Sequence, residues 1–146
     1  MKKFSILVIC LFLTSCRFGQ NESCVEIEKN FYLVKWDDNS WISYTKDDDS
    51  IFNTENIVIG HNVFAVGNNK DFIVGKQHPC KNKEEHFIDF DSLIPNKEIT
   101  NFFIIDIRND DFKVHSFNNE NDFDNCKNHF GIPKSLPYKF YDKYLE

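Results

Sequence analysis

The chain has few glycines, few basic residues and no long apolar run, and each shortage excludes a class of protein. Its five glycines are scattered singly among 146 residues, so no glycine-rich loop is present to cradle a phosphate. The longest apolar run, residues 4–13, spans ten residues, whereas a helix needs about 20 to cross a bilayer. Lysine and arginine number 17 against 23 aspartates and glutamates. This balance argues against nucleic acid as a partner, because such a partner requires a basic patch.

Motifs for catalysis and for metal binding are also missing. There is no Gly-x-Ser-x-Gly elbow and no recognisable Cys-His-Asn order for a nucleophile. His78, Cys80 and His86 are donors that zinc accepts, but they lack the paired spacing of zinc sites. The acidic runs at 47–49 and 119–124 lack the glycine and the closing glutamate of a helix-loop-helix calcium site. We therefore expect no catalytic residue, metal or cofactor, and an enzyme is the less favoured class.

The amino terminus has the pattern of an export signal. Two lysines precede the apolar run, which ends in the tetrapeptide LTSC (13–16). This tetrapeptide resembles the lipobox of bacterial lipoproteins, which implies cleavage after Ser15 and a lipid anchor with acyl chains such as palmitate on Cys16. The alternative is an ordinary signal peptide, but Leu13 fits ordinary cleavage poorly. Because two or more acyl chains hold a protein stably at a membrane, we predict a lipid-anchored protein of the bacterial cell membrane or outer membrane, facing the periplasm or the exterior.

The remainder of the chain has the length of one ordinary domain. Removal of residues 1–15 leaves 131 residues, in which 15 basic side chains face 23 acidic ones, a formal net charge of −8. Residues 17–23, RFGQNES, are polar and aperiodic, and they are typical of a tether. The predicted organisation is a signal peptide at 1–15, a lipidated cysteine and tether at 16–23, and a single domain at 24–146.

Three cysteines remain once the signal peptide and the anchor are set aside. Cys24, Cys80 and Cys126 are an odd number for an exported protein, and export permits disulfides without requiring them. Cys126 stands at helical spacing from Phe123 and Phe130, which indicates a buried side chain. If one disulfide forms, we expect Cys24 to pair with Cys80, because both lie in polar, turn-rich surroundings.

Short runs of β-branched and aromatic residues between turn residues predict an antiparallel sheet. The expected strands lie at 31–36, 41–44, 56–60, 63–67, 72–77, 102–107 and 112–117, with a shorter one near 86–90. Residues 118–130 predict a helix that is capped by Asn118 or Asn119 and ends before Gly131. The predicted fold is α+β, an antiparallel sheet of six or seven strands with one C-terminal helix packed on a face.

Two tryptophans and two serines have alternative interpretations. Trp36 and Trp41 flank a predicted four-residue turn (37–40) and should face each other across a hairpin. Hairpin or core packing is the favoured interpretation, and a platform for ligand stacking is the alternative. Ser50 and Ser92 lie in Asp-Ser-apolar triplets, which resemble the O-glycosylation acceptor pattern of one group of Gram-negative anaerobes.

Part of the chain resembles an uncharacterised family, a domain of unknown function, of small bacterial lipoproteins. The resemblance rests on the segments NIVIGHNVFAVGNNKDFIVGKQHP, NFFIIDIRNDDFKVHSF and FGIP. It covers residues 56–133, and the lipobox agrees with it. It implies a strand series followed by a terminal helix, and it brings no activity, cofactor or catalytic residue.

Together these features favour a non-catalytic binding or interaction module of the cell envelope. The alternatives are an envelope hydrolase of glycans or peptides, with Trp36 or Trp41 stacking on the substrate, and an immunity-type lipoprotein that neutralises a basic toxin. An enzyme should have a deep pocket lined by titratable groups of shifted pKa. A binding module should instead offer a protein partner or an envelope component a flat face or a sheet edge.

Overall fold

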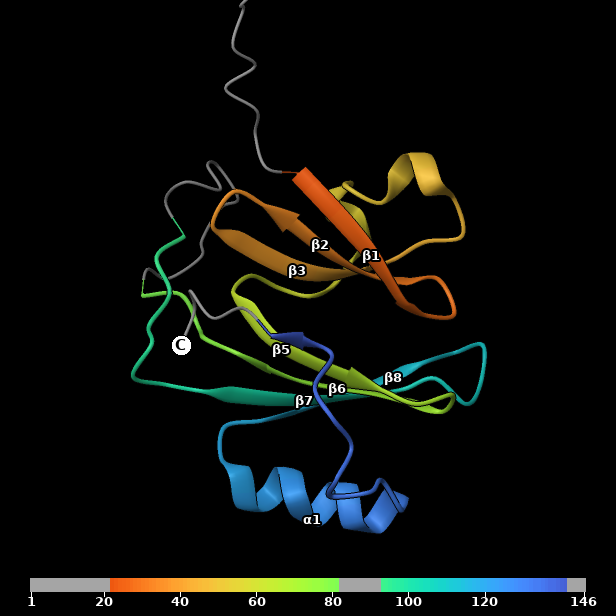
Figure 1. The fold of residues 1–146 in the computed structure, drawn as a ribbon, viewed down its shortest axis with the longest axis vertical. Coiled ribbons are helices and arrows are strands. Elements are labelled where there is room, and N and C mark those ends of the chain that lie inside the picture. Colours follow the sequence, from red (N-terminus) through yellow and green to blue (C-terminus); the bar gives the residue numbers. More distant parts are fainter. Residues whose placement is uncertain (1–21, 82–92, 142–146) are drawn as a thin grey trace, which may run out of the picture.

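The computed structural model describes residues 22–81 and 93–141 (Figure 1). Cys16, the signal peptide, the strand expected near 86–90, His86 and Ser92 lie outside the described residues. Within the described ranges, no helix is both long enough and apolar enough to span a membrane. The first strand begins at Glu22, two residues before the expected boundary of the folded part.

The strands form two antiparallel sheets. The first sheet has the order β1-β2-β3-β4, made of β1 (Glu22–Glu28), β2 (Phe31–Trp36), β3 (Asn39–Tyr44) and β4 (Ile57–Ile59). The second has the order β8-β7-β6-β5-β9, made of β5 (Val63–Asn68), β6 (Phe72–Gln77), β7 (Asn101–Asp106), β8 (Lys113–Phe117) and β9 (Phe140–Tyr141). The 3-10 turns η2 (Asp48–Ser50) and η3 (Thr54–Asn56) precede β4, and the helix α1 (Glu120–Phe130) follows β8.

The two sheets and α1 form three layers, with the second sheet in the middle (Figure 1). The core between the sheets includes Phe31, Leu33, Ile42, Val66, Ile73, Phe103 and Ile105. The core between the second sheet and α1 includes Phe72, Val74, Phe102, Ile104 and Phe123. Each fully buried side chain of this kind contributes about 1.5–3 kcal/mol, so both faces of the second sheet stabilise the fold.

The C-terminal helix is confirmed, with both of its predicted ends. The side chain of Asn119 accepts a hydrogen bond from the backbone N–H of Asp122 at 2.9 Å, which selects Asn119 as the cap. Gly131 follows the last turn with φ of +70°, a left-handed conformation that glycine adopts readily. Phe123 is 1 % exposed, and its ring lies 5.1 Å from that of Phe102. The helix therefore covers one sheet face as predicted.

The prediction of one sheet of six or seven strands was wrong. Every residue of β5 is buried, and a strand buried on both faces gives a continuous apolar run that does not reveal its layer. Only three residues (60–62) separate β4 from β5, a spacing that also suits a hairpin. Instead they carry the chain from the first sheet to the second, with Asn62 in a left-handed conformation at φ of +61°.

The predicted pairing of Trp36 with Trp41 was also wrong. The loop between β2 and β3 has two residues, and the register pairs Trp36 with Asn39 and Val34 with Trp41. Asn39 and Ser40 resemble turn residues, but both are buried in β3. The side chain of Asn39 accepts hydrogen bonds from the backbone N–H groups of Ser40 (2.7 Å) and Asn62 (3.2 Å). Buried polar groups are tolerated when they are hydrogen-bonded. The strand β3 therefore begins at Asn39, two residues before the predicted start at Trp41.

Candidate functional site

The strand β8 forms one edge of the second sheet. It pairs with β7 on one side, and no strand in the described ranges pairs with the other side. Its five residues include no proline, and their register with β7 is regular, without a bulge. An edge of this kind presents backbone N–H and C=O groups with which another extended chain can pair.

The side chains of β8 alternate between two environments. Lys113, His115 and Phe117 face the side of α1, where the rings of His115 and Phe130 lie 5.3 Å apart. Val114 and Ser116 face the side of the first sheet, but Val114 is 39 % exposed and Ser116 is exposed. The first sheet therefore leaves this face of β8 uncovered.

A recess lies beside the start of β8, where the edges of the two sheets approach each other. Its volume is about 340 Å³, and it is lined by Tyr44, Glu55, Asn56, Ile57, Val58, Phe112 and Val114. The rings of Tyr44 and Phe112 lie 5.0 Å apart, and Phe112 meets Phe31 of the core edge-on at 5.0 Å. We call this the apolar recess, because Glu55 brings the one carboxylate to an otherwise largely apolar lining.

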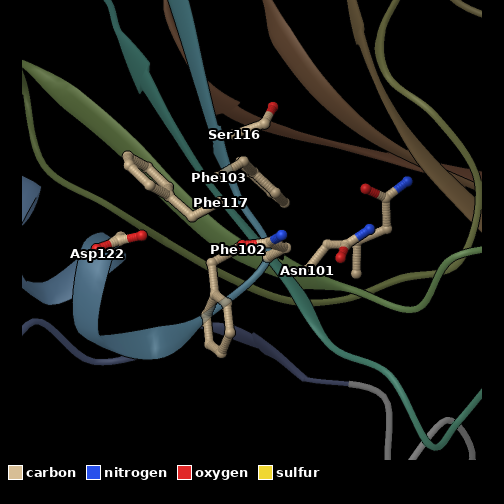
Figure 2. Close-up of a pocket in the computed structure, with 8 residues that line it drawn as sticks. Asn101, Phe102, Phe103, Ser116, Phe117 and Asp122 are labelled. Carbon is tan, nitrogen blue, oxygen red and sulfur yellow. The ribbon is translucent and has the colours of Figure 1, made fainter.

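A second recess, of about 450 Å³, lies beside the end of β8 (Figure 2). It is lined by Gln77, Asn101, Phe102, Phe103, Ser116, Phe117, Asn118 and Asp122. Figure 2 shows Asp122 projecting from α1 on one side of the phenyl rings, and Asn101 on the other. We call this the amide recess, because three amide side chains, a hydroxyl and a carboxylate surround the rings. Such groups donate and accept hydrogen bonds.

A third recess, of about 490 Å³, adjoins the amide recess at Phe102. It is lined by Phe64, Lys76, His78, Glu98, Thr100, Phe102 and Glu120. The Lys76 ammonium lies 3.9 Å from the Glu120 carboxylate and 5.6 Å from the centre of the Phe102 ring. All three recesses are shallow and open to solvent, in contrast to the enclosed pockets that bury small-molecule ligands.

The titratable groups with displaced pKa values lie away from these recesses. A two-pronged hydrogen bond from Arg108, at 2.6 and 2.9 Å, lowers the pKa of Asp106. Burial and a hydrogen bond to Asp48 raise the pKa of Tyr32, and burial raises that of the Cys126 thiol. None of these described groups lines a recess. Their displaced pKa values therefore reflect packing and ion pairing.

A buried polar cluster holds the crossing between the sheets. Asn39 Nδ2 lies 3.1 Å from His61 Nδ1, and Asn62 Nδ2 lies 3.2 Å from Cys80 Sγ. His78 stacks on Phe64, with ring centres 4.3 Å apart. Among the described residues, no group of three or more His, Cys, Asp and Glu side chains is placed to hold a metal ion. The contacts of Asn39 and Asn62 link β3, the crossing at 60–62 and Cys80.

The tryptophans occupy different environments. Trp41 is 1 % exposed, and its indole N–H donates to Ser43 Oγ at 3.1 Å, so its ring presents no face to a ligand. Trp36 is half-buried and meets Phe52 edge-on at 6.1 Å. Core packing, the favoured interpretation, therefore fits Trp41. Part of the Trp36 side chain is exposed to solvent.

The cysteines and Ser50 do not form a common site. Cys24 is an exposed free thiol on β1 and Cys126 is a half-buried free thiol, while Cys80 is half-buried with its Sγ 3.2 Å from Asn62 Nδ2. The Cys24–Cys80 disulfide stays a prediction. The hydroxyl of Ser50 lies 2.6 Å from that of Thr45 within the η2 turn, where it stabilises local structure.

The sequence did not identify the β8 edge as the candidate site. Residues 112–117 were predicted as a strand, and the polar and apolar residues of KVHSF suit a partly exposed one. Edge position, however, depends on which strands pair over long range. The sequence feature that could have indicated an edge position is the partial polarity of this strand, which follows the strongly apolar β7.

Comparisons with known proteins give one match. No curated protein and no solved structure matches the chain. The family model described as "Protein of unknown function (DUF3997)" matches residues 28–144. This confirms the expected membership in an uncharacterised family and extends it beyond residues 56–133, to include most of the first sheet. The chain belongs to this family of unknown function.

Proposed function

We propose that the protein is a membrane-anchored bacterial lipoprotein whose folded part is a non-catalytic interaction module of the cell envelope. The anchor is Cys16, supported by the LTSC tetrapeptide behind a basic and apolar start. Residues 17–23, polar and aperiodic, would be the tether between the lipid and the folded part. This length keeps the module close to the membrane surface.

The observation that carries the interaction hypothesis is the open edge of β8 with a recess at each end. Strand edges bind extended segments through backbone hydrogen bonds, and neighbouring recesses select their side chains. An active site usually combines an enclosed pocket with groups of shifted pKa. The described recesses are shallow, and the shifted groups Tyr32, Asp106 and Cys126 lie elsewhere.

Charge favours one form of this interaction. The predicted mature chain has a formal net charge of −8, which would steer a basic partner toward it. Neutralisation of a basic toxin by an immunity-type lipoprotein is therefore the second candidate function. The envelope hydrolase is less well supported, because Trp41, one of its two substrate-stacking candidates, is buried.

The anchor and the module are tested together in cells of the source bacterium. Wild-type protein should label with an alkyne fatty acid and fractionate with membranes, whereas Cys16→Ala should lose the label and the membrane association. In-cell crosslinking of wild-type protein should capture one stoichiometric protein partner. Unchanged labelling and fractionation of Cys16→Ala would exclude the anchor. Turnover of an envelope glycan or peptide by the purified protein, without a captured partner, would exclude the non-catalytic module.

A further inference from the structure

We propose that β8 binds an extended, positively charged peptide segment of another protein, which adds to the second sheet as a further strand. This inference rests on the proposed function and specifies its binding surface and the chemistry of its partner. The segment would pair with the open edge of β8, and its alternate side chains would enter the apolar and amide recesses.

The spacing of the two recesses matches that of an added strand. Val114 lines the apolar recess and Ser116 lines the amide recess, and both face the side of the first sheet. Alternate residues of a strand lie on the same face, about 7 Å apart. A segment paired with β8 would therefore place two of its same-face side chains beside Val114 and Ser116.

The other sheet edges have features that oppose pairing. The strand β1 carries Glu22, Glu26 and Glu28, and its register shifts between Glu26 and Glu28. The strands β4 and β9 have three and two residues. Charge, irregularity and short length all protect strand edges from association. The strand β8 has five residues in regular register, so it is the edge best suited to a partner.

The charges around β8 select a basic segment. Glu55 lies in the apolar recess and Asp122 in the amide recess. Asp110 and Asp111, both exposed, precede the strand. Lys113 offsets part of this charge, but it lines neither recess. Lysine or arginine in the bound segment would meet these carboxylates, while an apolar residue would contact Val58 and Phe112.

The same charges oppose a second copy of the chain as the occupant. Two mature chains would each carry a formal net charge of −8, and their association at β8 would bring the carboxylates of both edges together. Like charges at an interface lower affinity. We therefore favour a partner of opposite charge over self-association.

The test uses full-length protein in detergent, panned against a displayed library of random ten-residue peptides. Enriched peptides should alternate apolar residues with lysine or arginine. The best peptide is synthesised with a fluorescent label, and its Kd is measured by anisotropy. Val114→Lys should raise the Kd at least about tenfold, since it places a cation in the apolar recess. Val25→Lys on β1 is the matched control, because Val25 is 45 % exposed and the charge change is the same. The Kd of the peptide for Val25→Lys should stay within about twofold of its Kd for the wild-type protein.

Backbone methylation distinguishes strand addition from simple charge attraction. One peptide is N-methylated at alternate residues, and a second at the intervening ones, so that each loses the N–H groups of one edge. One of the two should lose binding and the other should retain it, because an added strand pairs through one edge only. Equal binding of both methylated peptides would overturn the proposal, as would wild-type affinity for Val114→Lys.

The remaining outcomes are equally decisive. No enriched peptide, or enrichment of acidic peptides, would overturn the proposal. The protein could also self-associate in sedimentation experiments. If Val114→Lys abolished that self-association, the edge would be assigned to a second copy of the chain, and the proposal would be overturned. If a stoichiometric partner is still captured in cells, the interaction module stands and binds through another face. Failure of the wild-type protein to capture any partner in cells would instead count against the proposed function.

Discussion

Gly75 lies in the middle of β6, where the backbone is covered by the phenyl ring of its neighbour in β7. Gly75 is paired with Phe103, which is 2 % exposed. A Cβ at this position would collide with the Phe103 ring and would lie 2.6 Å from the carbonyl oxygen of Ala65. The absence of a side chain thus allows the Phe103 ring to fill the core between the sheets.

Substitution of this glycine should therefore destabilise the protein. We expect Gly75→Ala to lower the free energy of unfolding by about 3 kcal/mol, the upper part of the usual cost of overpacking. Gly60→Ala is the control, since its added Cβ would find its nearest neighbour, Gln77 Nε2, at 3.8 Å. Urea denaturation monitored by tryptophan fluorescence measures both. Equal stability of Gly75→Ala and wild type would contradict the described packing of Phe103.

The Asp106–Arg108 pair makes stability depend on pH. Asp106 is 8 % exposed, and the hydrogen bond from Arg108 lowers the pKa of its carboxyl below the ordinary value, with a smaller effect from His115. Lys113 is its partner in the β7–β8 register. Since the folded-state pKa is the lower one, the stabilisation is present above about pH 4 and is lost as the pH falls through the folded-state pKa.

Removal of this carboxylate should therefore matter at neutral pH and not in acid. We expect Asp106→Asn to cost about 1 kcal/mol at pH 7, a modest figure because Arg108 is half-exposed. The difference from wild type should shrink at pH 3. Asp110→Asn, at an exposed position, should match wild type at both values. A deficit of Asp106→Asn that is the same at pH 7 and pH 3 would exclude the ion pair as its cause.

At the scale of elements, the sequence predicted α1 better than the sheets. The helix is specified locally, by a cap, an apolar stripe ending at Phe130 and the glycine that follows. Strand positions were also predictable from local patterns, but the assignment of strands to sheets was not. The segments at β4 and β5 are both apolar, and nothing local indicates that residues 60–62 cross between layers. Such pairing is decided by contacts remote in sequence.

The start of α1 provides a prediction at this scale. The sequence did not decide whether Asn118 or Asn119 caps the helix, and the structure selects Asn119. We expect Asn119→Ala to lower the free energy of unfolding by about 1 kcal/mol, because the N–H of Asp122 loses its acceptor. Asn118→Ala should cost less than about 0.5 kcal/mol. Thermal denaturation of the two variants compares them, and the reverse order would place the cap at Asn118.

At the scale of the whole molecule, three layers place α1 and the first sheet on opposite faces of the second (Figure 1). Both faces of the second sheet are thereby occupied, which leaves its edge as the place where backbone groups meet solvent. Composition and charge were readable from the sequence, and they are the basis for expecting no nucleic-acid partner. The edge was not readable, because Lys113–Phe117 looks like any partly exposed strand until its neighbours are known.

The central claim is that the protein binds its partner through the β8 edge, and site-specific photocrosslinking in cells tests it most directly. A photoreactive amino acid replaces Ser116 on β8 or, as the control, Ser23 on β1, and both positions are exposed serines on edge strands. We predict one discrete adduct with another protein from position 116, its loss on the added Val114→Lys substitution, and no such adduct from position 23. An equal adduct from both positions, or an adduct from position 23 alone, would contradict the account.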